Sequence, residues 1–188
     1  MQTPHWRYFQ LLEDDLSECY RYAHPCREHF DVHSEHFARI ILMASTEIEN
    51  CIRGYAHSVN YAPVPRSIGQ YFTFINSRHP SFTASKIYLP EYSLNFEPWN
   101  AWSSSNTPDW WTYGYNKVKH DRLQYPNAPT FRRATESIGA LFELLLHYYS
   151  YLDPQCCLPM NTAPTLFVLH EEPTDFQSGG VYWSWTLP

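Results

Sequence analysis

The sequence has few charged residues and no excess of positive charge. Lysine, arginine, aspartate and glutamate together make up 17% of the 188 residues, and the formal net charge is -6. A protein that binds duplex nucleic acid along its phosphates needs a basic surface, so that class of protein is excluded. Any contact with a nucleic acid would have to be local.

Three further features are missing from the chain. No run of apolar residues approaches the roughly 20 that a membrane helix requires, and residues 1–7 contain no apolar core of a signal peptide. The five cysteines form no CxxC pair of the kind that binds zinc. We therefore expect a cytoplasmic protein with reduced thiols, without membrane contact, metal or cofactor.

Aromatic residues, by contrast, are abundant. They make up 18% of the chain, as 15 Tyr, 11 Phe and 7 Trp. So many large rings indicate an ordered, densely packed chain rather than a disordered one. The length suits one compact domain with a single core, so we expect residues 1–188 to form one domain.

Apolar residues recur at spacings of three and four in five segments, which is the period of an amphipathic helix. We predict helices over residues 6–23, 34–60, 67–76, 108–125 and 130–152. Alternating apolar residues predict β-hairpin ribbons over about residues 85–97 and 165–186. The predicted fold class is therefore mainly α, a bundle of four to five helices with two small β-hairpin ribbons.

Residues 110–122, which we call the focal segment, concentrate the chemically versatile side chains. On an α-helix, Asn116, Lys117 and His120 share one face. Arg122 lies on another face with Tyr115, turned by about 160° from His120. A histidine can take or give a proton near neutral pH, a lysine can hold a phosphate, and an asparagine can orient either. The first face is therefore a candidate for acid–base chemistry.

Plain structural interpretations of these residues stay open. His120 can be hydrogen-bonded within a helical interface while Lys117 and Lys119 are solvated. A group of tryptophans can either stack on bases or form a packed lid. Its members are Trp99, Trp102, Trp110 and Trp111. The histidines near the second helix, at positions 24, 29, 33 and 36, are interpreted as surface residues because they lack a complete set of metal ligands.

The order Tyr115-Asn116-Lys117-Val118-Lys119-His120-Asp121-Arg122, late in a chain of four or five helices, resembles the HEPN superfamily (higher eukaryotes and prokaryotes nucleotide-binding). The hallmark of that family is an arginine, four to six residues and then a histidine, often with a polar residue directly after the arginine. Asn116 matches the polar position and His120 the histidine, while Tyr115 stands at the position of the arginine. Glu47 is the candidate for an acid that the family often carries on its second helix, facing the motif.

The resemblance implies a fold, an activity and a set of site residues. Active HEPN proteins are metal-independent endoribonucleases, usually dimeric, in which the histidine assists attack of a ribose 2′-OH on the adjacent phosphate. Other members bind RNA, nucleotides or proteins without cleaving. The implied function is a homodimeric protein directed to single-stranded RNA, as a ribonuclease of the toxin–antitoxin or phage-defence kind or as its inactive relative.

By this resemblance, catalysis is assigned to His120, Asn116 and Glu47. Substrate binding is assigned to Lys117, Lys119, Arg122 and Tyr115. The alternative is a non-catalytic protein- or nucleotide-binding module that uses the same helix as an interface. Both hypotheses depend on which face of the focal segment is exposed.

Overall fold

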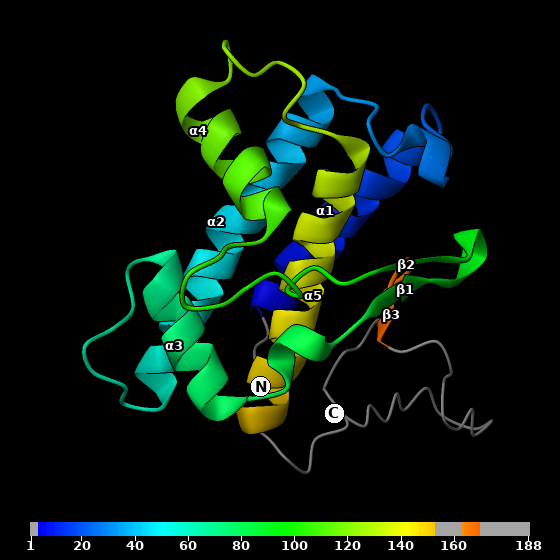
Figure 1. The fold of residues 1–188 in the computed structure, drawn as a ribbon. Helices are drawn as coiled ribbons and strands as arrows, with labels where there is room; N and C mark the ends of the chain where they lie inside the picture. The colour runs from blue at the N-terminus through cyan, green and yellow to red at the C-terminus, as the bar shows by residue number, and fades with distance from the viewer. Residues whose placement is uncertain (1–3, 153–162, 170–188) are drawn as a thin grey trace, which may run out of the picture.

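The structure, a computed structural model, describes residues 4–152 and 163–169. It is mainly helical, as predicted, with one small antiparallel sheet beside the helices (Figure 1). The helices are α1 (Pro4–Tyr20), α2 (Glu35–Ser58), α3 (Ile68–Arg78), a π-helix (Trp110–Asn116) that continues into α4 (Lys117–Asp121), and α5 (Phe131–Leu152). Within the described ranges, no helix combines the length and the apolar character that crossing a membrane would need.

Side-chain caps begin α2 and α5. Ser34 and Thr130 each accept a hydrogen bond from the backbone N–H three residues later, at 3.1 and 3.3 Å. Each bond satisfies a donor that the first turn leaves without a partner. The π-helix begins at Trp110 without a side-chain cap, and the hydroxyl of the preceding Thr107 contacts the hydroxyl of Thr112.

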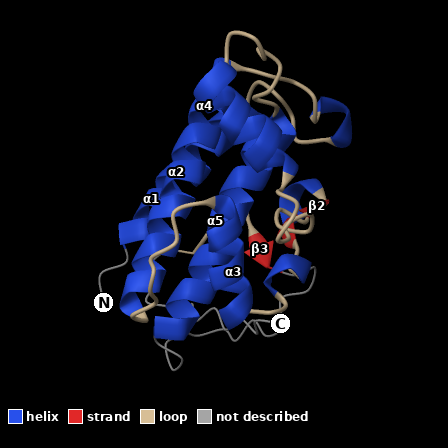
Figure 2. Ribbon diagram, turned by 60° about the vertical axis from the view of Figure 1, so that its left-hand side comes forward, coloured by secondary structure: helices blue, strands red, loops and turns tan. Residues whose placement is uncertain are grey.

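Helix α5 lies at the centre of the structure. It packs along α2, while α1 packs against both helices (Figure 2). The rings of Phe9 on α1 and Phe142 on α5 stack with centroids 5.4 Å apart. Both rings are fully buried, together with Ile40 and Ile48 of α2. Removing this apolar surface from water supplies the main favourable free energy of folding.

The sheet contains the first predicted ribbon and one strand of the second. Strand β1 (Ile87–Leu89) pairs antiparallel with β2 (Leu94–Phe96), which confirms the ribbon expected over residues 85–97. Strand β3 (Val168–Leu169) pairs with the other edge of β1, giving the order β2-β1-β3. The second ribbon was predicted to begin near residue 165, and its remainder, residues 170–186, lies outside the described residues. Its first strand joins the existing sheet because the free edge of β1 offers unpaired backbone groups.

A buried carboxylate on α1 binds the segment before β3 through hydrogen bonds. The side chain of Glu13 is almost completely buried, and it accepts hydrogen bonds from three consecutive backbone N–H groups. The donors are Thr165 and Leu166, both at 2.8 Å, and Phe167 at 3.3 Å. Burial raises the pKa of Glu13, whereas these hydrogen bonds lower it. An acid on an otherwise apolar helix face thus positions a segment more than a hundred residues later.

The close approach of β1 to α5 generates a test of this packing. A Cβ atom at Gly139 would lie 1.9 Å from Cδ1 of Ile87 and 3.2 Å from its Cγ1. Ile87 is completely buried and has little room to rotate away. We expect Gly139→Ala to lower the free energy of unfolding by about 1–3 kcal/mol through overpacking.

Gly69 on α3 is the matched control, because a Cβ there meets no atom within 4 Å. We expect Gly69→Ala to raise stability by up to about 1 kcal/mol, since alanine restricts the unfolded chain more than glycine does. Urea denaturation of both variants measures the difference. Equal stability of the two variants would contradict the described contact between β1 and α5.

Candidate functional site

The focal segment is not one regular α-helix. Residues 110–116 form a π-helix and residues 117–121 an α-helix, so the helix ends at Asp121 rather than near Tyr125 as predicted. The backbone N–H groups of Gln124 and Tyr125 both bond to the carbonyl oxygen of Asp121, which closes the last turn. Pro126 keeps the helix from continuing beyond this turn, because a proline disfavours helical conformation at the residue before it. π-helical turns are rare and frequently occur at functional sites.

Tryptophans hold the π-helix against the rest of the molecule. Trp99, Trp102, Trp110 and Trp111 are all buried. Nε1 of Trp99 donates a hydrogen bond to the carbonyl oxygen of Ala140 at 3.2 Å, and Nε1 of Trp110 donates to that of Pro98 at 2.7 Å. These rings form a packed lid and cannot stack on bases.

Tyr115, which stands where the resemblance would place an arginine, is buried on the inner side of the focal segment. Its hydroxyl donates a hydrogen bond to Oε1 of Glu49 at 3.2 Å and accepts one from Nζ of Lys119 at 2.9 Å. Glu49 in turn accepts a hydrogen bond from Arg53 at 3.3 Å, and Arg53 donates to Tyr71 at 3.1 Å. The substrate contact expected for Tyr115 is wrong, because a buried side chain cannot reach a substrate. The residue connects α2 to Lys119 instead.

This network positions Lys119. The hydrogen bond from its ammonium group to Tyr115 raises the pKa of Lys119, because it favours the charged form. The ammonium also lies 4.8 Å from the centre of the Tyr115 ring. Lys119 therefore remains a fixed positive charge at the surface of the focal segment.

Glu47 does not face the focal segment. Its Oε1 lies 2.5 Å from Nδ1 of His5, so the carboxylate is paired with α1. Residues two apart on a helix are separated by about 200° of rotation, which turns Glu49 toward Tyr115 when Glu47 faces α1. The expectation that Glu47 faces the motif is corrected, and Glu49 is the acid in that position. The sequence carries no signal for this choice, because the i,i+4 pair of Glu49 and Arg53 lies within α2 and does not show which helix packs beside it.

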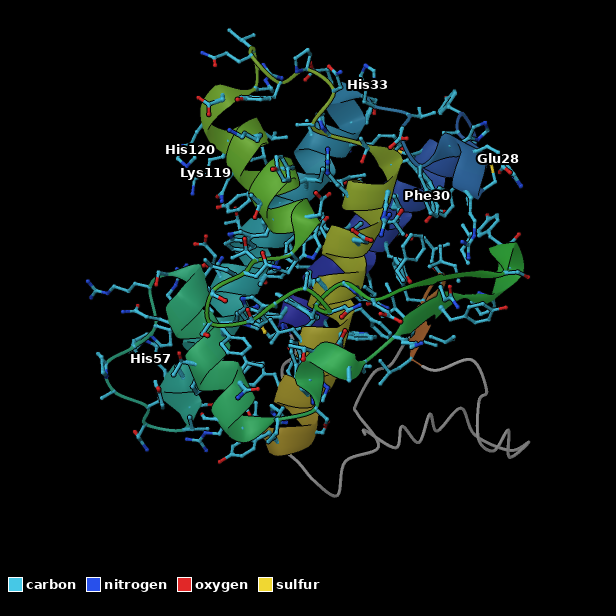
Figure 3. All side chains as sticks on the ribbon, viewed as in Figure 1. Glu28, Phe30, His33, His57, Lys119 and His120 are labelled. Carbon is cyan, nitrogen blue, oxygen red and sulfur yellow. The ribbon has the colours of Figure 1, made fainter. Side chains whose placement is uncertain are left out.

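The outer face of the focal segment carries the predicted polar group. Asn116 and Lys117 are half-buried and His120 is exposed. Figure 3 shows His120 and Lys119 projecting from α4 on its outer side. Among the described residues, no hydrogen bond or ion pair involves the His120 side chain. Lys117 lies 3.9 Å from Asp121, which is beyond hydrogen-bonding distance.

Arg122 points away from His120. Its guanidinium forms an ion pair with Glu35 in the first turn of α2. This agrees with the rotation of about 160° expected between the two positions on a helix. Within one protomer, the guanidinium and the imidazole therefore face different regions.

The histidines near the start of α2 form no metal site. His29 contacts a neighbouring carbonyl oxygen, that of His24, through Nδ1 at 2.8 Å. Across residues 4–152 and 163–169, no group of three or more His, Cys, Asp or Glu side chains could hold a metal ion.

A second polar pair lies inside α5, away from the surface. Glu143 and His147 are one helical turn apart and almost completely buried, and none of their side-chain polar atoms has a hydrogen-bond partner. Burial raises the pKa of Glu143 well above its ordinary range, and the nearby Ser85 hydroxyl opposes the effect only partly. Burial, with His79 beside it, lowers the pKa of His147 to about 3. Burial therefore favours the neutral form of both groups.

Because the Glu143 carboxyl is buried, we predict that the effect of Glu143→Gln on Tm depends on pH. Because the pKa of Glu143 is higher in the folded state, its contribution to stability is complete below the unfolded value and is lost as pH rises toward the folded value. We expect Glu143→Gln to gain in Tm relative to the wild type between pH 5 and pH 8. The gain should be a few degrees, since about 1 kcal/mol corresponds to about 2–4 °C in a chain of this size.

Glu18, which is exposed on α1, provides the control. Glu18→Gln removes the same charge without relieving burial, so its Tm difference from wild type should stay flat across this pH range. Parallel curves for both variants would show that Glu143 ionises as freely as a surface acid.

The Tyr115 network predicts the effect of Tyr115→Phe. This change keeps the buried ring and removes the hydroxyl between Lys119 and Glu49. We expect a loss of about 1.5–3 kcal/mol in the free energy of unfolding, as for hydrogen bonds to charged groups, and a lower pKa of Lys119. Tyr113→Phe is the control, because Tyr113 is 53% exposed. An equal effect of both changes on urea denaturation would contradict the network.

Comparison of the chain with protein-family models, with curated proteins and with solved structures finds no match.

Proposed function

We propose that the protein acts on single-stranded RNA through the outer face of the focal segment, as a homodimer of the HEPN kind. The contrast between the two faces of this segment carries the proposal. The inner face is occupied by contacts of Trp111, Tyr115 and Val118 with the rest of the protein. The outer face presents Asn116, Lys117 and an exposed His120, which is available for a ligand.

The local charge supports an anionic ligand. Residues 113–133 contain five lysines or arginines and a single aspartate, a formal charge of +4 in a chain whose total is -6. Two of these cations, Arg132 and Arg133, are paired with Glu136 and Asp109. The other three, Lys117, Lys119 and Arg122, lie within the focal segment, where Arg122 pairs with the exposed Glu35 and Lys117 lies 3.9 Å from Asp121. This arrangement provides local phosphate contacts in an acidic protein.

The outer face has groups suited to metal-independent cleavage of RNA. In the reaction that the resemblance implies, a 2′-OH attacks the adjacent phosphate, a base takes its proton, and an acid protonates the leaving 5′-oxygen. His120 acts as the acid or the base, and Asn116 orients it. Lys117 and Lys119 hold the negative charge of the phosphate. Glu47 has no part in this proposal, because it is paired with His5.

A dimer supplies what one protomer lacks. Arg122 is turned from His120 and pairs with Glu35, but both side chains are exposed, at 50% and 79%. Such surface pairs contribute little to stability, so a phosphate can compete for the guanidinium. If the outer faces of two focal segments meet, His120 of the second copy provides the second proton-transfer group. Arg122, on the other side of its segment, can then contact a neighbouring phosphate of the same RNA.

A second candidate function is a non-catalytic module that binds another protein. The observation in its favour is Leu123, directly after α4, which is 90% exposed. Exposed leucines that gather with other apolar groups mark protein interfaces, and Tyr113 and Tyr125 are also exposed. In this alternative the same surface contacts a partner and His120 has no chemical role.

The two candidates differ in the effect of His120→Ala on RNA. We expect the wild-type protein to cleave mixed single-stranded RNA in the presence of a chelator. His120→Ala should reduce the rate by about 100-fold or more, the contribution expected of a general acid or base. Gel analysis of end-labelled RNA measures the rate.

His57→Ala is the matched control. His57 is also exposed, and in Figure 3 it lies far from His120, toward the other end of α2. The His57→Ala variant should cleave RNA at the wild-type rate. RNA that stays equally intact with the wild type and with His120→Ala would contradict the nuclease proposal. An equal loss of activity in His120→Ala and His57→Ala would assign the activity to a contaminant.

A further inference from the structure

A small pocket opens to solvent where the focal segment meets the turn before α5. Its volume is about 230 Å³. The residues that give it chemical character are Tyr113, Lys117, Gln124, Tyr125, Asn127 and Arg133. Lys117 lines the pocket and also belongs to the outer face with His120, so it connects the pocket with the proposed site.

Two tyrosine rings give the pocket an aromatic lining. Tyr113 and Tyr125 are 53% and 41% exposed, unlike the buried tyrosines and tryptophans of the core. Neither ring is needed to fill the interior. An exposed ring of this kind can stack on an unpaired base, whereas the bases of a duplex already stack on one another.

Each ring also has a cation beside it, and the two cations differ. The guanidinium of Arg133 lies 5.7 Å from the centre of the Tyr113 ring, but it is held by Asp109 and by the carbonyl oxygen of Ala128. The ammonium of Lys117 lies 4.1 Å from the centre of the Tyr125 ring and makes no hydrogen bond among the described residues. Arg133 is therefore held in place as part of the pocket lining, and Lys117 is the cation that can contact a phosphate.

Amide groups complete the lining. The side chains of Gln124 and Asn127 have no hydrogen-bond partner in the described part of the chain, so their donors and acceptors are available to a base edge. The pocket is smaller than the roughly 300–1,000 Å³ of sites that enclose a whole small ligand. It fits one unit of a longer chain better than a free small molecule.

We propose that this pocket binds one unpaired nucleotide of a single-stranded RNA, with the base stacked on Tyr125 and Tyr113 and a phosphate at Lys117. The inference rests on the proposed function and adds to it a binding position beside the phosphate that the 2′-OH attacks with the help of His120. It explains why an acidic protein keeps exposed rings, free amides and a lysine together at this end of the focal segment.

The test measures binding separately from cleavage. All variants are made in the His120→Ala background, and a fluorescent eight-nucleotide single-stranded RNA is titrated in chelator at several salt concentrations. Tyr125→Ala should weaken binding by about ten-fold or more, and Tyr125→Phe should bind like the parent because it keeps the ring. Lys117→Ala should weaken binding and reduce the slope of log affinity against log salt by about 0.7.

Tyr22→Ala is the control, because Tyr22 is 92% exposed and does not line the pocket. It should leave affinity unchanged. Affinities of Tyr125→Ala and Lys117→Ala equal to the parent would overturn the pocket proposal even if His120-dependent cleavage is observed. Loss of affinity without any cleavage by the wild type would keep the pocket and remove only the nuclease step.

Two further outcomes also overturn the pocket proposal. One is a parent protein that does not bind the RNA at any salt concentration. The other is a change of oligomeric state in Tyr125→Ala, measured by sedimentation without RNA, with RNA binding intact. That second result would assign the rings to a protein contact.

Discussion

The packing of the focal segment against α2 and α5 determines which of its side chains reach the surface. The rings of Trp110 and Trp111 are buried against the bundle, and the Tyr115 hydroxyl bonds to Glu49 of α2. These contacts fix the rotation of the segment about its own axis. Because the inner face is fixed, Lys117 and His120 must lie on the opposite side. The chemistry available at the surface is thus a consequence of packing.

Much of the fold could be predicted from the period of the apolar residues. The separation of Arg122 from His120 on different faces of the focal segment also followed from helical geometry alone. The π-helix could not be predicted, because its altered hydrogen bonds leave no separate period in a short, aromatic-rich segment. The choice between Glu47 and Glu49 depends on which helix packs on which side of α2. That is a property of tertiary packing, which a single helical pattern does not contain.

Buried polar residues show the same limit. Glu13 and Glu143 are acidic residues, which the sequence alone would place at the surface. Glu13 is satisfied by backbone N–H groups of the segment before β3, whereas Glu143 has no partner among the described residues. Helix α5 is buried on nearly every side, so even the polar positions of its pattern lie in the core.

The central claim is that the outer face of the focal segment contacts single-stranded RNA. NMR spectra of the ten histidine rings during titration with single-stranded RNA in chelator test this claim most directly. The account predicts that the His120 ring signals shift together with the backbone amides of residues 113–127, while the His57 signals stay in place. Shifts confined to other surfaces, or no shifts at saturating RNA, would contradict it.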